Sequence, residues 1–211
     1  NPTGGNVFDS PLSKYDDNYS KIKYDYNISK SKVFKISHLR EKYIKTSYYP
    51  YYYNPDNYIL NGKKFKNGEM LRNEINFQYY SKTLKYNIMV GMEIYKEEYS
   101  SYNIYDINND TLQASIFNGQ NLTKFSDNLS IYFYEERKLK NNDILSYGLR
   151  MLNEENQFLP SLSYLLRGRD DYNYRFSYTS GYKNPSIKEK YYEWLDHAGP
   201  AIFGNPNLNS E

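Results

Sequence analysis

The stretch 84-LKYNIMVGMEI-94 places apolar residues at its even positions and mostly polar residues or glycine at its odd positions. This period of two is that of a β-strand, whose successive side chains point to opposite faces, and differs from the 3.6-residue period of a helix. The stretch therefore predicts a strand with one apolar face and one polar face.

The same alternation returns along most of the chain. It covers seven further segments, at 22–28, 33–43, 74–79, 129–133, 145–151, 162–166 and 172–182. The only helix that the pattern indicates is a short one over 186–195, directly after Pro185. The sequence thus predicts an all-β chain of about eight strands.

The connections between these segments are sorted by length. The short, polar ones span 29–32, 81–83, 138–143 and 167–171, and the alternate ones include 44–68, 96–128, the brief 153–158 and the tail from residue 183. Alternate turns of a meander lie at opposite ends of a sheet, so one end is expected to be tight and the other to carry large loops. This layout predicts an antiparallel up-and-down meander, forming a partial transmembrane β-barrel with short periplasmic turns and long extracellular loops.

The composition is that of a hydrophilic chain that is unusually rich in aromatic residues. The 211 residues include 28 Tyr and 10 Phe, the mean hydropathy is −0.92, and no Cys is present. A formal charge of +2 gives no electrostatic reason to expect a nucleic-acid partner. On the barrel interpretation Glu74, Glu93, Arg150 and Arg175 face a wet lumen. A half-solvated antiparallel sheet on a soluble domain is the alternative that the pattern leaves open.

Two motifs near the end of the chain carry a family resemblance. The segment 172-YNYRFSYTSGYKNPSIKEKYY-192 resembles the strand-and-loop pattern ySxGFRaPSlkELY of TonB-dependent outer-membrane receptors, and 204-GNPNLNSE-211 resembles their GNPnLkPE box. The residues that match are Gly181, Tyr182, Pro185, Ser186, Glu189, Tyr191, Gly204, Asn205, Pro206, Leu208 and Glu211. The resemblance extends over most of 70–211, and it departs from the pattern at 183-KN-184 and 209-NS-210.

The resemblance implies a fold and a function. Such receptors have a barrel of about 22 strands filled by an N-terminal plug, with a TonB box that couples transport to inner-membrane energy. Residues 1–211 are therefore expected to be an internal fragment of the barrel, with plug, TonB box and C-terminal strands absent and both terminal strands left as unpaired edges. The implied location is the bacterial outer membrane.

The resemblance also implies partners. We expect TonB-dependent active uptake of an iron complex, siderophore or haem, or of a similar scarce nutrient. The expected partners are that ligand, outer-membrane lipid and, through the absent N-terminal part, the TonB energy-coupling complex. No enzymatic activity, cofactor or bound metal is expected, and haem enters only as a transported ligand.

Ligand contacts are expected in the long loops. The run 48-YYPYYY-53 offers Tyr49, Tyr51 and Tyr52 for stacking on a flat ligand, although loop packing explains such tyrosines equally. His197 lies between the two motifs, where the resemblance to haem receptors implies a haem-iron ligand and where a solvated loop histidine is the alternative. The neighbouring Tyr191, Tyr192 and Trp194 are further candidates.

Two rival functions remain at this point. One is a passive porin-like or adhesin-like barrel, and the other is a soluble carbohydrate-binding β-protein. The paired motifs favour the importer over the first rival. No nucleophile elbow or phosphate-binding loop is present in the sequence, which argues against a hydrolase or an NTPase.

Overall fold

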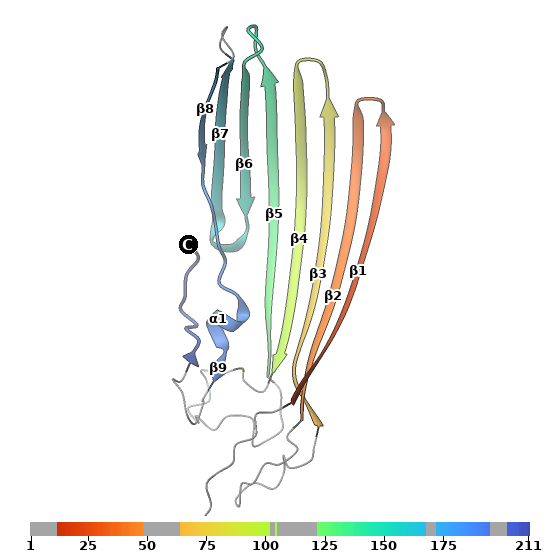
Figure 1. The fold of residues 1–211 in the computed structure, drawn as a ribbon, viewed down its shortest axis with the longest axis vertical. Coiled ribbons are helices and arrows are strands. Elements are labelled where there is room, and N and C mark those ends of the chain that lie inside the picture. Colours follow the sequence, from red (N-terminus) through yellow and green to blue (C-terminus); the bar gives the residue numbers. More distant parts are fainter. Residues whose placement is uncertain (1–11, 49–63, 102–103, 105–121, 168–171, 195–201) are drawn as a thin grey trace, which may run out of the picture.

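The computed structural model describes residues 12–48, 64–101, 104, 122–167, 172–194 and 202–211. Its main body is one open antiparallel sheet whose eight strands follow each other in chain order. They are β1 (Leu12–Ser29), β2 (Lys32–Tyr48), β3 (Lys64–Lys82), β4 (Tyr86–Ser101), β5 (Leu122–Lys138), β6 (Ile144–Leu152), β7 (Gln157–Arg167) and β8 (Asn173–Thr179). Figure 1 shows the tight connections β1–β2, β3–β4 and β5–β6 at one end of the sheet, and β1 and β8 form its two edges.

The predicted meander is confirmed, but the first five strands are longer than the alternation indicated. β3 spans 19 residues where the pattern marked only 74–79, and its pairing with β4 continues to Gly68 opposite Ser101. The expected loops at 44–68 and 96–128 were therefore too long. Past the apolar stretch polar and apolar residues occur on both faces of these strands, so the period-two signal fades while the backbone ladder continues.

The register gathers apolar side chains into rows on one face, called here the outer face. Two of these rows run through Tyr24, Ile36, Phe77, Met92 and Ile131, and through Tyr26, Phe34, Tyr79, Val90 and Phe133. Ile131 on the central strand β5 remains 51% exposed. A continuous band of exposed apolar side chains, backed by a polar opposite face, is the arrangement of strands that face lipid.

The tail after β8 folds into a small structure of its own. Its helix α1 (Ile187–Tyr191) is followed by β9 (Glu193–Trp194), which pairs with β10 (Ile202–Phe203). The helix is shorter than the predicted 186–195, and β8 ends at Thr179 instead of reaching residue 182. The helix stops early because the chain continues into β9, which pairs with β10. Figure 1 shows α1 and β9 beside the lower half of β5, beneath the shorter β6, β7 and β8.

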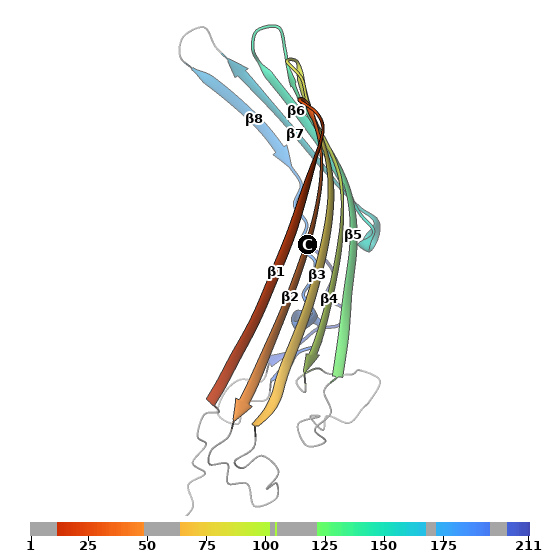
Figure 2. The same cartoon turned by 90° about the vertical axis from the view of Figure 1, so that its right-hand side faces the viewer.

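Figure 2 shows the sheet edge-on as a curved wall. In the part of the chain that the structure describes, the buried apolar side chains are Tyr99, Ile104, Leu152 and Ile187. Three of them form one cluster, where the tail meets the end of β4. None of the described helices is long and apolar enough to cross a membrane.

Candidate ligand-binding vestibule

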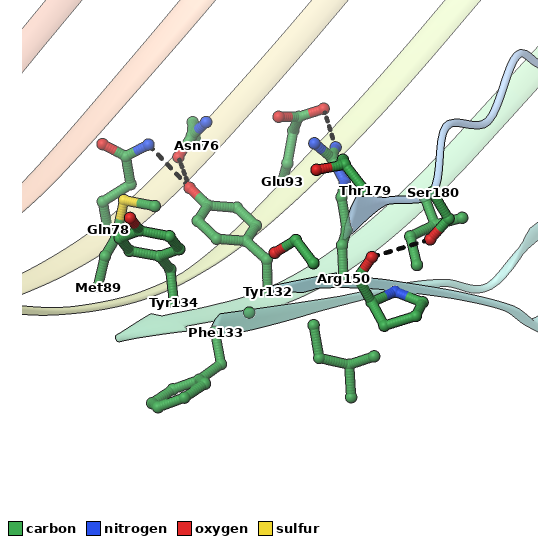
Figure 3. A pocket seen from close by; sticks show the side chains of 15 residues that line it. Asn76, Gln78, Met89, Glu93, Tyr132, Phe133, Tyr134, Arg150, Thr179 and Ser180 are labelled. Carbon is green, nitrogen blue, oxygen red and sulfur yellow. Dashed lines mark hydrogen bonds and ion pairs between the residues drawn. The ribbon is translucent and has the colours of Figure 1, made fainter. Parts of the chain in front are cut away.

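The inner face at mid-height is a hydrogen-bonded polar wall. Figure 3 shows Tyr132 of β5 pointing across the sheet to Asn76 and Gln78 of β3. Its hydroxyl donates to Asn76 Oδ1 at 3.1 Å and accepts from Gln78 Nε2 at 2.8 Å. The ring crosses β4 at Gly91, where an added Cβ would lie 2.3 Å from the ring. Glycine is therefore needed at this position for the bridge to form.

An ion pair lies beside this bridge. Arg150 of β6 donates to Glu93 at 2.9 Å and to the Ser130 hydroxyl at 2.8 Å. The strand register also places Glu74 and Arg175 on the inner face. The predicted lumen-facing positions are thus all on the polar side of the wall.

The inner face toward the long loops carries aromatic rings paired with cations. The pairs, with the distance from the cationic centre to the ring centroid, are Lys45 over Tyr15 (5.7 Å), Arg72 over Tyr95 (5.1 Å), Lys124 over Tyr191 (4.9 Å) and Lys188 over Tyr99 (4.9 Å). We call these eight residues the vestibule. Cations over aromatic faces are an arrangement suited to flat, negatively charged ligands.

A small apolar core fixes the tail against the vestibule. Tyr99, Ile104 and Ile187 are each at most 6% exposed and pack together. Met70 and Leu122 pack against this cluster from β3 and β5. The core therefore ties α1 to β3, β4 and β5, which carry two of the four paired cations, Arg72 and Lys124.

Hydrogen bonds within the tail bring its two ends together. Lys183 and Glu211 exchange backbone hydrogen bonds of 2.9 and 3.1 Å, and Gly204 donates to the Tyr192 carbonyl at 2.7 Å. The approach is so close that a Cβ on Gly204 would lie 2.7 Å from the carbonyl carbon of Lys190. Segments 181–192 and 204–211 therefore form one unit.

This unit is also attached to the β6–β7 connection, the 3₁₀ turn Glu154–Asn156. Glu154 accepts a hydrogen bond from Asn184, and Glu155 accepts from the Ser210 hydroxyl. Burial raises the pKa of Glu154, whereas the hydrogen bond from Ser210 lowers the pKa of Glu155. We call the tail segments 180–194 and 202–211, together with the turn at 153–156, the clasp.

Glu189 is the central charged residue of the clasp. It accepts from Lys183 Nζ at 2.9 Å and from the Ser186 backbone amide at 2.7 Å. Ser186 in turn accepts from the Glu189 amide at 3.2 Å, which completes a capping box on α1. The Lys183 ammonium and the Ser186 bonds lower the pKa of Glu189 to about 2.

Comparison with known proteins identifies the family. The family model described as "TonB dependent receptor-like, beta-barrel" matches residues 1–211. The chain belongs to this receptor family. Receptors of this family are transporters of the bacterial outer membrane and carry out TonB-dependent uptake. No curated protein and no solved structure matches the chain.

Three of the predicted ligand-contact residues of this receptor chain, Tyr191, Tyr192 and Trp194, lie in the clasp. Tyr191 packs on the apolar core below Lys124, and Tyr192 is held by its backbone, which accepts from Gly204. Trp194 belongs to β9, opposite Ile202. The remaining candidates, Tyr49, Tyr51, Tyr52 and His197, lie outside the described residues.

The family-motif residues contribute to the clasp in different ways. Pro185 is buried, and Asn205 donates to the Glu189 carbonyl at 3.0 Å while its own carbonyl accepts from Leu208. Pro206 lies in the turn between them, and Gly181 has open space around its Cβ position. The motifs therefore encode mainly the clasp, and Tyr191 is the one motif residue that also lines the vestibule.

The vestibule tyrosines on the strands were missed from the sequence. Tyr15, Tyr95 and Tyr99 share the inner-face parity of the predicted lumen residues, and this is the signal that could have found them. They lie beyond the apolar band, where alternation no longer marks the strand. No group of three or more His, Asp or Glu residues that could hold a metal occurs among the described residues of the receptor chain.

Proposed function

We propose that this part of the receptor wall takes part in the uptake of an aromatic, negatively charged iron complex. The proposal is supported by the vestibule, in which Tyr15, Tyr95, Tyr99 and Tyr191 each lie under a cation. The lysines of the vestibule attract an anion, whereas Arg72 is paired with Glu74 at 3.1 Å. The exposed ring of Tyr15 offers surface for stacking on flat ligand groups, and the buried Tyr99 serves to hold the core. A ferric catecholate siderophore has both properties.

Haem has the same two properties, since its ring is flat and its propionates are anionic. His197 would then be the candidate ligand for the haem iron, because a neutral imidazole suits that role. Transport itself would depend on energy from the TonB complex, with this chain as part of the barrel. A passive porin-like barrel would need no such energy.

The vestibule is tested by titration of the receptor that contains this chain. Ferric tris-catecholate is added to the wild type and to the triple variant Lys45→Gln/Lys124→Gln/Lys188→Gln, and binding is followed by quenching of protein fluorescence. Each lost charge is worth about 0.5–1 kcal/mol at a partly exposed site, so the triple variant should bind about 10–100-fold more weakly.

The control is the variant Lys14→Gln/Arg40→Gln/Lys96→Gln, which removes three exposed charges from the outer face. It should bind ferric tris-catecholate like the wild type. Equal affinity in the vestibule variant, or an equal loss in the control, would refute the role of the vestibule.

The transported ligand and its energy source are tested separately. A Soret shift with haem that disappears in His197→Ala would favour haem over a catecholate. Iron uptake by cells should stop when the proton-motive force is dissipated. Uptake that continues would instead support the passive-barrel alternative.

A further inference from the structure

The tight connections form one continuous rim at the end of the sheet opposite the clasp. The first three, at 29–32, 82–86 and 138–144, lie at the upper end in Figure 1. The first three are joined by backbone hydrogen bonds of 2.8 Å, from Lys82 to Ser31 and from Lys138 to Lys85. In the outer membrane, short turns of a barrel face the periplasm. We call this edge the periplasmic rim.

The periplasmic rim carries an excess of positive charge. Counted over the first three turns and the adjoining residues 135–137, its basic residues are Lys30, Lys32, Lys82, Lys85, Arg137, Lys138 and Lys140, and its acidic residues are Glu135, Glu136 and Asp143. The rim therefore has a net charge of about +4, whereas the whole chain has +2.

The acidic groups of the rim are already engaged. Glu135 accepts from Arg137 at 2.7 Å, and Glu136 accepts from Asn87 at 3.0 Å. Asp143 accepts from the Tyr164 hydroxyl at 2.9 Å. Within the described part of the chain, by contrast, no ion pair neutralises the lysines of the first three turns. Their ammonium groups are available to an anion.

The rim also has features of a surface that enters a membrane interface. Leu84, at the tip of the second tight turn, is 93% exposed, and Tyr86 below it is 38% exposed. The next outer-face residue of β4 is Ile88, which lies opposite Ser81 of β3 and Glu135 of β5. Ammonium groups beside exposed apolar side chains match the border between lipid head groups and acyl chains.

The opposite edge of the apolar band is nearly balanced in charge. The two outer-face rows beyond it contain the cations Arg40, Lys42 and Lys96 and the anions Glu98 and Asp127. Positive charge is therefore concentrated at the periplasmic edge of the band.

We propose that the periplasmic rim binds the phosphate groups of anionic phospholipids in the periplasmic leaflet of the outer membrane. The lysines of the first two turns hold the head group, and Leu84 and Ile88 contact its acyl chains. The inference rests on the membrane location of the family and is independent of the transported ligand.

The test uses the receptor that contains this chain, reconstituted in nanodiscs of phosphatidylcholine with or without phosphatidylglycerol. Native mass spectrometry counts the lipids retained by the wild type, by Lys30→Gln/Lys82→Gln/Lys85→Gln and by the outer-face control Lys14→Gln/Arg40→Gln/Lys96→Gln. Each Lys near an anionic surface contributes roughly fivefold in affinity, so the rim variant should bind phosphatidylglycerol about 100-fold more weakly at low salt.

The wild type and the control should retain phosphatidylglycerol in preference to phosphatidylcholine. No preference in the wild type, or full retention by the rim variant, would overturn the proposal. The rim variant should also bind ferric tris-catecholate like the wild type, while the vestibule variant should retain lipid. Failure of the ligand proposal is thereby distinguished from failure of the lipid proposal.

Discussion

The strand wall and the clasp are held together by different interactions. The wall is a ladder of eight strands with hardly any buried side chains, and its stability depends on repeated backbone pairing and on the solvent that each face meets. The clasp has a small apolar core and a few hydrogen bonds between residues far apart in sequence, such as Glu155 and Ser210, which are 55 positions apart. We therefore expect the wall to tolerate a local change that would disrupt the clasp.

Glycine substitutions give the largest expected contrast. Gly204→Ala places a methyl group against the backbone of Lys190 and Tyr191, which cannot move without unwinding α1. We expect this overpacking to destabilise the clasp by about 1–3 kcal/mol. Hydrogen exchange in the receptor that contains this chain should then show faster exchange of the amides at 187–192.

Gly181→Ala is the matched control for this change. It lies in the other tail segment of the clasp, and its Cβ would meet no atom within 4 Å. Exchange at 187–192 should stay at the wild-type rate. Equal effects of the two alanines would show that backbone approach does not hold the clasp closed.

The corresponding change in the wall is Gly91→Ala. Its methyl group would meet the outer end of the Tyr132 ring, which can rotate away at the cost of the hydrogen bonds to Asn76 and Gln78. We expect a loss of about 1 kcal/mol and unchanged strand pairing. Thermal unfolding of the receptor is the measurement.

The variant Tyr132→Phe tests the cause of that loss. If displacement of the hydroxyl explains the effect, the double variant Gly91→Ala/Tyr132→Phe should be only slightly less stable than Tyr132→Phe alone. Fully additive losses would point to a distortion of β4 instead.

The same contrast explains what the sequence could predict. Alternation at 84–94 and its repeats identified all eight strands and their order, because every strand follows one rule. It could not mark the ends of β1–β5, where polar and apolar residues occur on both faces, and so Tyr95 and Tyr99 were missed. The motifs at 181–192 and 204–211 were found by resemblance. That the two segments pack against each other could not be predicted, because their association depends on the contacts of Gly204, Glu154 and Glu155.

A smaller difference between the clasp and the wall is expected at low pH, where the clasp should lose stability. Glu189 has a pKa lowered from 4.5 to about 2, first by the Lys183 ammonium and then by Ser186. A carboxylate with a depressed folded-state pKa contributes stability that is complete above the unfolded value and is lost as pH falls toward the folded value. The clasp should therefore loosen between about pH 4.5 and pH 2.

Two variants test this assignment by hydrogen exchange at 187–192, normalised for the intrinsic pH dependence of exchange. Glu189→Gln removes the titrating group, so protection should be weaker at neutral pH and should change little as pH falls. Lys183→Met removes the main cause of the depressed pKa of Glu189, so the acid loosening should move to a higher pH. A wild-type pH profile in Lys183→Met would show that the ion pair with Glu189 does not control the clasp. Exchange in the paired backbone of β3 and β4 serves as the internal reference, since the register there contains no part of this pair.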